Sequence, residues 1–227
     1  LDIGIKTFAS LSDGTQIENP KFLVKSFKKI KRAQRKLSHK KNGSCNRKKQ
    51  IIKLAKLHEQ VANQRKDFHF QTAHWLVNTY GLIAVEKLSP QFMIKNHKLA
   101  NSATDIAISQ FFDILTYEAY KHQTLVGQVD PKNTSQLCSK CKQLVSKDLS
   151  VRTHQCPYCG FVCDRDVNAA INIVDRIPDE LKQKYILLRN GTVGTIETLT
   201  PVETSTAVFE SKDLKISAVI ETGSQWL

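Results

Sequence analysis

Two closely spaced pairs of cysteines constrain the fold of this chain more than any other feature. Cys138 and Cys141 form one Cys-x-x-Cys pair, and Cys156 and Cys159 form a second pair that is separated from the first by 14 residues and is followed by Gly160. Each pair can wrap a tight turn that directs two thiolates at one ion, so two pairs give a tetrahedral four-cysteine site. In a reducing compartment such pairs are typical of metal ligands rather than disulfides. The spacing predicts a closed, structural zinc ribbon, with a redox dithiol as the alternative.

The remaining cysteines and a nearby histidine are given no ligand role. Cys163 is predicted to be a small buried residue rather than a fifth ligand. Cys45 lies in a basic loop and has no evident partner. His154 is expected at the surface, because four thiolates already complete the site.

The charge of the chain is strongly positive and unevenly distributed. Lysine and arginine number 34 against 21 acids, a net charge of +13, and residues 21–66 hold 17 of these cations with Glu59 as the single acid. Like charges crowded on neighbouring helices repel one another, and a phosphate backbone between them relieves that repulsion. The pattern favours a nucleic-acid partner. A solvated basic face is the alternative.

Periodicity of the apolar residues predicts an alternation of strands and helices. Short strands are expected over 3–18 with a turn at Asp13-Gly14, and helical spacing predicts a hairpin of two helices. The expected elements are a helix from 21 to about 37, a break at 41–44, a helix over about 47–80, a strand over 81–86, a helix near 102–122, a strand over 124–130 and a helix over about 166–176.

Other sequence features bear on location and extent. The sequence has no apolar run long enough for a membrane span and no signal peptide at its start, which predicts a cytoplasmic protein without a membrane partner. The chain opens at Leu1, and its one methionine is Met93, which indicates a piece of a longer translation product. Residues 178–227 are expected to form a polar tail, either loosely ordered or a small appendage, with weak strand-like alternation over 214–221.

Three carboxylates at the edges of apolar segments are candidates for a divalent-metal site. Asp2 lies in the first strand, Glu86 ends a later strand of parallel type, and Asp166 opens the last core helix. In a mixed sheet these positions can converge on one face, and carboxylates are the hard ligands that hold Mg²⁺. Taken singly, each acid also fits an ordinary surface role. Asp166 also fits a helix cap or dipole placement, and Asp164 competes with it for that position.

Four segments together resemble the TnpB (OrfB) family encoded by bacterial insertion sequences. They are Leu1–Ala9, Ile83–Leu88, the two cysteine pairs and Asp164–Ile173, and the resemblance covers about residues 1–177. It implies a RuvC-type nuclease of the RNase H-like fold: a mixed α/β sheet with an inserted basic helical hairpin and an inserted zinc ribbon. It also implies Asp2, Glu86 and Asp166 as catalytic Mg²⁺ ligands, with Arg165 and Asn168 in support.

The resemblance also implies a division of the chain and a set of partners. Residues 1–130 would form the first part of the nuclease core with the basic hairpin at about 21–80, 131–163 the zinc ribbon and 164–177 the last core helix. Members of this family are RNA-guided DNA endonucleases with a long amino-terminal region, which lies outside this sequence. The expected partners are DNA and a guide RNA from the transposon end. A non-catalytic nucleic-acid-binding remnant or regulator and a strand-transferring transposase are the alternatives.

Overall fold

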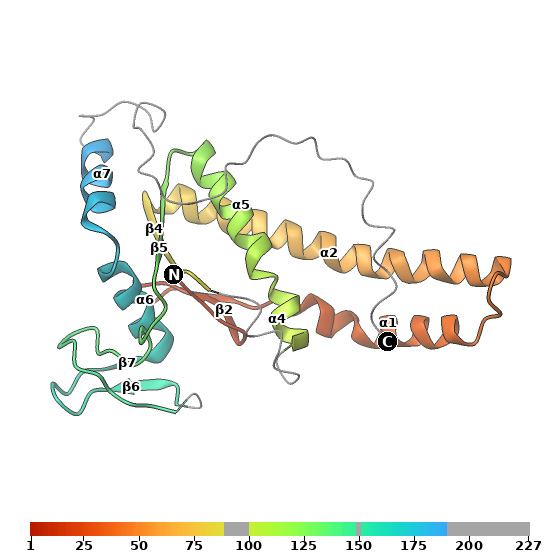
Figure 1. Ribbon diagram of the computed structural model, residues 1–227, viewed down its shortest axis with the longest axis horizontal. Helices are drawn as coiled ribbons and strands as arrows, with labels where there is room; N and C mark the ends of the chain where they lie inside the picture. The colour runs from red at the N-terminus through yellow and green to blue at the C-terminus, as the bar shows by residue number, and fades with distance from the viewer. Residues whose placement is uncertain (89–99, 149–150, 190–227) are drawn as a thin grey trace. The chain divides into compact units, whose positions relative to one another are not determined.

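A computed structural model describes residues 1–88, 100–148 and 151–189, which all lie in the first of two units of the chain, Leu1–Val193 (Figure 1). A second unit, Gly194–Leu227, lies outside the described residues, and so does the strand-like segment expected at 214–221. In chain order the elements are β1 (Asp2–Ile3), β2 (Thr7–Ser10), β3 (Gln16–Glu18), α1 (Phe22–Ser38), α2 (Cys45–Thr79), β4 (Leu82–Glu86), α4 (Ala100–Ile106), α5 (Ile108–Lys121), β5 (Leu125–Val129), β6 (Thr153–Gln155), β7 (Val162–Asp164), α6 (Arg165–Asp175) and α7 (Asp179–Arg189).

The strands form three hydrogen-bonded groups. β1, β2 and β3 are antiparallel, β4 and β5 are parallel, and β6 and β7 form an antiparallel pair. The single mixed sheet expected from the sequence is therefore divided among the described residues. The backbone still brings the first two groups together, because the amino group of Leu1 donates to the carbonyl oxygen of Ala84 at 2.8 Å.

Local chemistry explains where the predicted hairpins turn. The β2–β3 turn lies at Asp13-Gly14 as expected: Gly14 has a φ of 91°, and the Asp13 carboxylate accepts from the N–H of Thr15 at 2.8 Å. Between the two long helices, Gly43 has a φ of 77°. Ser44 then caps α2 by accepting from the N–H of Arg47 at 3.2 Å. A positive φ suits glycine, which has no Cβ to clash.

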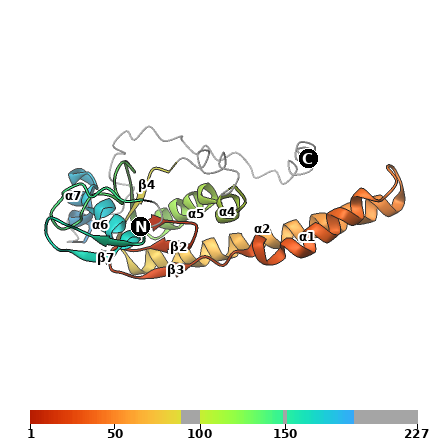
Figure 2. The same cartoon turned by 90° about the horizontal axis from the view of Figure 1, so that it is seen from below.

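The predicted helical hairpin is confirmed, and α2 is its longer member. With 35 residues, α2 is about 52 Å long at the usual helical rise. Figure 2 shows α1 lying along α2, and Ile30, Ala33 and Val61 are buried in these two helices. At the base of the hairpin, the Asp105 carboxylate accepts from the N–H of Leu23 at 3.1 Å and from Arg65 at 3.3 Å.

Two sequence expectations are wrong in detail. The helix expected near 102–122 is divided into α4 and α5 at Ala107, whose φ is 47°. The tail expected from residue 178 begins with the helix α7, which packs closely on the strands. A Cβ added at Gly127 would lie 2.6 Å from Leu181, and one added at Gly81 would lie 2.6 Å from Tyr185. Two glycines thus admit a helix that the polar composition of this segment does not predict.

The parallel pair β4–β5 has a different helical layer on each face. Ile83 and Val85 join the larger core with residues of α2 and α5. Ala84 lies on the other face and joins a smaller core with Ile173 and Ile177 at the end of α6. Side chains alternate along a strand, so Glu86 shares its face with Ala84 and is directed toward the side of α6.

Candidate functional site

Three distant carboxylates meet where β1, β4 and α6 come together. Asp2 lies between the buried residues Leu1 and Ile3, so alternation directs its side chain away from the larger core. Glu86 is the last residue of β4, and Asp166 lies in the first turn of α6, which contacts both strands. The fold therefore places the three predicted acids on one side of the strands.

The ionisation of Asp2 is sensitive to the other two carboxylates. Burial raises the pKa of Asp2 to about 7, and the negative charges of Glu86 and then Asp166 add to this increase. Burial also raises the pKa of Glu86, against the effect of a hydrogen bond from Thr134. Like charges gathered in a partly desolvated place disfavour their ionised forms. A divalent cation would relieve that repulsion.

Asp166 is held by arginines rather than used as a helix cap. Asp164 is the N-cap of α6, and its carboxylate accepts from the N–H groups of Asp166 and Val167 at 2.8 and 3.3 Å. The Asp166 carboxylate instead pairs with Arg165 at 3.0 Å and with Arg152 at 3.4 Å. The sequence left the two aspartates in competition, and the structure gives the cap to Asp164.

The carboxylate cluster has an open spacing. In the described part of the chain it is not among the groups whose ligand atoms all come within 4.8 Å of one another. Mg²⁺ usually keeps several of its waters and binds through one or two carboxylates, so its sites need not be closed protein cages. The donor set therefore fits a hard divalent cation with a partial water shell.

The four cysteines form a tight group that can hold a metal ion. Their sulfur atoms all lie within 4.8 Å of one another, and the Sγ–Sγ distances are 3.8 Å for Cys138–Cys159 and 3.5 Å for Cys141–Cys156. All four are free thiols. A tetrahedral ion with metal–sulfur bonds of about 2.3 Å separates its ligands by about 3.8 Å. The sulfur positions thus fit a single four-coordinate metal.

Both cysteine pairs adopt the same backbone turn. Lys142 and Gly160, the residues that follow each pair, have φ values of 59° and 69°, and their N–H groups donate to the carbonyls of Cys138 and Cys156 at 2.9 and 3.0 Å. Burial raises the pKa of Cys156, but backbone N–H groups of Cys159 and Tyr158 and the neighbouring thiols lower it to about 6. The second turn therefore stabilises the thiolate form of Cys156, which is the form that binds metal. In the first turn, the backbone hydrogen bond from Gln143 lowers the pKa of Cys141, but burial and hydrogen bonds with the other thiols outweigh it and raise this pKa to about 12.

Buried asparagines of α6 clamp the first cysteine turn onto the helix. Asn168 accepts from the N–H of Ser139 at 3.0 Å and donates to the Leu137 carbonyl at 2.7 Å. Asn172 donates to the Thr134 and Leu137 carbonyls at 2.9 and 2.7 Å. Asn168, which the family resemblance places in support of the site, thus directs its amide at the cysteine module.

Sequence reasoning missed several residues that link the two clusters. Thr134 donates to Glu86, and Arg152, which lies between the two cysteine pairs, contacts Asp166, so two separate parts of the cysteine module contact different carboxylates. Asn172 lies one helical turn after Asn168, a spacing that signals a shared helix face. No periodic signal marks Thr134 or Arg152, because their partners lie far away in sequence.

His154 is the one clear error within the cysteine module. It was expected at the surface, but it is fully buried beside Phe161 and bonded to Lys147. Burial and the charge of Lys147 lower its pKa, which favours the neutral ring. Cys163 lies outside the four-sulfur group as expected, although it is half-buried rather than buried, and Cys45 is exposed at the start of α2.

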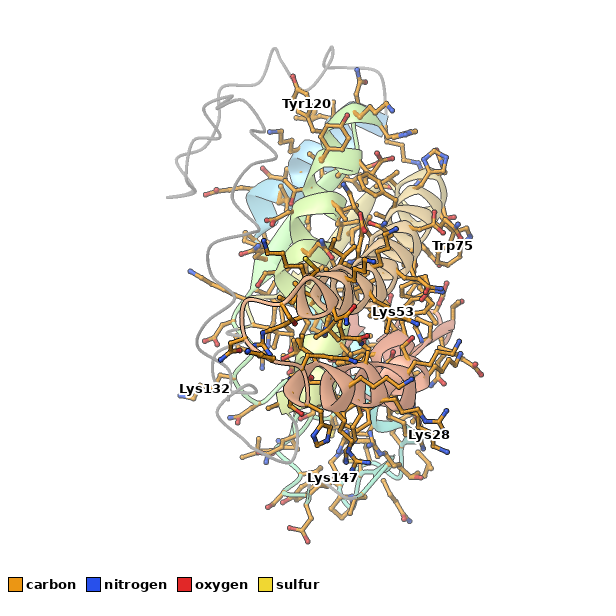
Figure 3. All side chains as sticks on the ribbon, turned by 90° about the vertical axis from the view of Figure 1, so that its right-hand side faces the viewer. Lys28, Lys53, Trp75, Tyr120, Lys132 and Lys147 are labelled. Carbon is orange, nitrogen blue, oxygen red and sulfur yellow. The ribbon has the colours of Figure 1, made fainter. Side chains whose placement is uncertain are left out.

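The basic hairpin presents its positive charge to solvent. Figure 3 labels Lys28 on α1 and Lys53 on α2, where side-chain nitrogens surround the two helices. The exposed cations of these helices before residue 60 are Lys25, Lys28, Lys29, Lys31, Arg32, Arg35, Lys36, Lys48, Lys49, Lys53 and Lys56. None of them forms an ion pair with a carboxylate within the described ranges.

Among the described residues, no helix is long and apolar enough to cross a membrane.

Two family models match successive parts of the chain. The model OrfB_IS605, described as a probable transposase, matches residues 1–97, and the model of the Cas12f1-like TNB domain matches residues 109–173. Two solved structures share the fold. A CRISPR-Cas12f ternary complex has a TM-score of 0.58, and a Cas12f1-sgRNA-target DNA complex has a TM-score of 0.52. Both solved chains are 21% identical in sequence to this one. The alignment with the ternary complex covers 76% of this chain and 37% of the solved chain, and the alignment with the Cas12f1-sgRNA-target DNA complex covers 75% and 47%, respectively.

Curated relatives identify the family of the chain. A putative RNA-guided DNA endonuclease of Streptomyces pristinaespiralis is 36% identical over 77% of this chain and 44% of its own length. The putative RNA-guided DNA endonuclease InsQ of Escherichia coli (strain K12) is 32% identical over 77% of this chain and 47% of its own length. TnpB-like protein L79 of Acanthamoeba polyphaga mimivirus is 34% identical over 65% of this chain and 30% of its own length. The chain belongs to the TnpB family, and it spans between about a third and a half of the length of these relatives.

Proposed function

We propose that this chain forms the nuclease part of a transposon-encoded, RNA-guided DNA endonuclease with an RNase H-like (RuvC) core. The convergence of Asp2, Glu86 and Asp166 carries the proposal, because α6 contacts both β1 and β4 and the three acids lie on one side of these strands. The relatives named as endonucleases favour cleavage over a non-catalytic remnant or a strand-transferring transposase.

Asp2, Glu86 and Asp166 would hold the catalytic Mg²⁺. When bound, Mg²⁺ neutralises charge on the scissile phosphate and makes a water molecule more nucleophilic. Neighbouring side chains orient these carboxylates. Thr134 orients Glu86 through a hydrogen bond, and Arg165 fixes the Asp166 carboxylate with contacts of 3.0 and 3.1 Å. Orientation of this kind matters because loosely held groups lose much of their catalytic effect.

The cysteine module would hold a structural Zn²⁺ and brace the carboxylates. Four thiolates leave no open position for a reacting group, so this metal would stabilise the fold rather than take part in chemistry. Thr134 and Arg152 extend from the module to Glu86 and Asp166. The zinc ribbon would therefore control the placement of the acids through its own folding.

The basic hairpin would bind nucleic-acid backbone. Eleven exposed cations on α1 and the first half of α2 lack a carboxylate partner in the described structure. Phosphate contacts of this kind release counterions, which makes binding weaken steeply with salt. Guide RNA and target DNA are the partners that the proposed function supplies for this surface.

Glu86→Ala in the whole translated protein, supplied with RNA from the transposon end, tests the assignment. We expect loss of Mg²⁺-dependent DNA cleavage by about 10³-fold or more, because one of three metal ligands is removed. Binding to DNA should change little, since the basic hairpin is untouched. Glu180→Ala, an exposed glutamate in the first turn of α7, is the matched control. Cleavage that survives Glu86→Ala would contradict the site, and salt-sensitive binding without cleavage by the unmodified protein would support the remnant.

A further inference from the structure

A second set of metal-ligand side chains lies at the α2–α5 contact, and the proposed nuclease function makes no use of it. His74 belongs to α2, and Glu118 and His122 lie one turn apart at the end of α5. Their ligand atoms all lie within 4.8 Å of one another. In the described residues, the four cysteines form the only other such group. Trp75 and Tyr120, labelled in Figure 3, are near neighbours of these ligands along α2 and α5.

We propose that His74, Glu118 and His122 bind a divalent transition-metal ion, with Zn²⁺ as the ligand tested below. The Oε2 atom of Glu118 lies 3.2 Å from Nδ1 of His74 and 3.7 Å from Nε2 of His122. Ligands bound tetrahedrally at the usual zinc–nitrogen and zinc–oxygen distances are about 3.4 Å apart. The two distances from the Glu118 carboxylate oxygen thus match the spacing of zinc ligands, and all three ligand atoms lie within 4.8 Å of one another.

The burial of the three ligands suits an ion at the rim of the helix contact. The side chain of Glu118 is 7% exposed, whereas those of His122 and His74 are 27% and 58% exposed. A buried carboxylate is costly without a positive partner, and the two rings are its partners in the structure. A metal ion would supply a permanent positive charge and keep open positions toward solvent.

Imidazole and a single carboxylate favour a transition metal over Mg²⁺. Two histidines and one carboxylate are the ligand set of many zinc and iron sites, whereas Mg²⁺ prefers oxygen ligands. This site therefore differs chemically from the carboxylate cluster and from the four thiolates. It would discriminate among metals by ligand type.

The frame around the ligands is fixed by the backbone. The Thr124 hydroxyl donates to the Val77 carbonyl at 3.1 Å and is buried, which ties the end of α2 to the turn before β5. Both helices lead directly into the parallel strands, and the cluster lies toward the start of β4 whereas Glu86 lies at its end. A metal here would staple the two core helices together without contacting the nuclease carboxylates.

Zinc binding by the full chain, purified with its cysteine module loaded, tests the proposal. Zn²⁺ is titrated calorimetrically in millimolar Mg²⁺, which occupies the carboxylate cluster. We expect one additional Zn²⁺ per chain and a rise in Tm on binding. His74→Ala and His122→Ala should each weaken this binding by about 100-fold and abolish the rise in Tm, because each removes one of three ligands. His58→Ala, an exposed histidine of the same helix α2, should behave as the unmodified chain.

Two results would overturn the proposal. The unmodified chain could take up no zinc beyond its cysteine module, which would leave the three residues as polar contacts between two histidines and a buried glutamate. The additional zinc could instead bind equally well to both alanine variants, which would place it elsewhere. His74 is more than half exposed, so His74→Ala is expected to keep the fold, and circular dichroism of both variants checks this.

Discussion

The cysteine cluster and the carboxylate cluster differ in how their ligands are distributed along the chain. The four cysteines lie within 22 consecutive positions, 138–159, whereas the three carboxylates are spread over 165 positions, from Asp2 to Asp166. The first cluster is built by two local turns with the same backbone geometry. The second exists only after β1, β4 and α6 have come together. A local site can form with its own module, and a distributed site depends on the whole core.

Yet the two clusters are joined by side chains of α6 and of the cysteine module. Asn168 and Asn172 hold the first cysteine turn to the helix that carries Asp166, and Thr134 and Arg152 contact the acids. The carboxylate cluster is therefore held in place partly by the cysteine module. Variants that separate local folding from long-range assembly test this dependence.

Removal of ligands from the proposed zinc site should give the largest effect. The double variant Cys138→Ser and Cys156→Ser takes one ligand from each turn, and zinc sites of this kind contribute about 10 kcal/mol or more of apparent binding free energy to folding. We expect loss of one metal equivalent per chain and of hydrogen-exchange protection in β6 and β7. Cys45→Ser, an exposed cysteine, is the control. A module that stays protected without its metal would show that the local site does not depend on zinc.

Asn172→Ala should give an intermediate effect at the junction between the clusters. It leaves the buried Thr134 carbonyl without its amide partner, a loss of about 1–3 kcal/mol of unfolding free energy. We expect reduced DNA cleavage with an unchanged zinc content, measured together on one preparation. The exposed Asn63→Ala on α2 is the matched control. Cleavage that matches the control would mean that the two clusters act independently.

The pH dependence of stability should reveal the smallest effect, at Asp2. Because the pKa of Asp2 in the fold is raised to about 7, the folded chain keeps a proton that the unfolded chain has already lost. Stability from this group is therefore full at low pH and falls as pH rises toward and through about 7. Between about pH 6 and about pH 8 the loss should be about 1 kcal/mol without Mg²⁺.

Asp2→Asn should remove this part of the pH dependence, as measured by urea unfolding at both pH values. Asp179→Asn, whose side chain is 88% exposed, should leave it in place. Added Mg²⁺ should also reduce the loss in the unmodified chain at the higher pH, because it binds the ionised carboxylate. An unchanged slope in Asp2→Asn would mean that Asp2 is not part of a repelling cluster.

Local patterns in the sequence predicted most elements and the four-sulfur group. The helical hairpin, the turn at Asp13-Gly14 and the two parallel strands follow from periodicity and turn chemistry. The break at Ala107 does not, because alanine ordinarily favours a continuous helix and only the tertiary packing selects its positive φ. The helix α7 was missed because the signal for its docking is the absence of side chains at Gly81 and Gly127.

Long-range partnerships were the least predictable part of the candidate site. The family resemblance indicated Asp2, Glu86 and Asp166, and their catalytic role remains a prediction. Nothing in the sequence pairs Thr134 with Glu86, and His154 was misplaced because its burial depends on how the module closes around Phe161. Spacing identifies residues that act within one turn, whereas contacts between modules need coordinates.

The attachment of the basic hairpin has a consequence for how such chains can vary in length. Asp105 holds the base of the hairpin through Leu23 and Arg65, and within the described residues the part of α1 and α2 beyond this base packs chiefly on itself. Insertions or deletions of matched turns at the far end would alter the reach of the arm by about 5.4 Å per turn. The core would keep its polar anchor. Arm length is thus a dimension along which this architecture can be lengthened or trimmed while its chemistry stays in place.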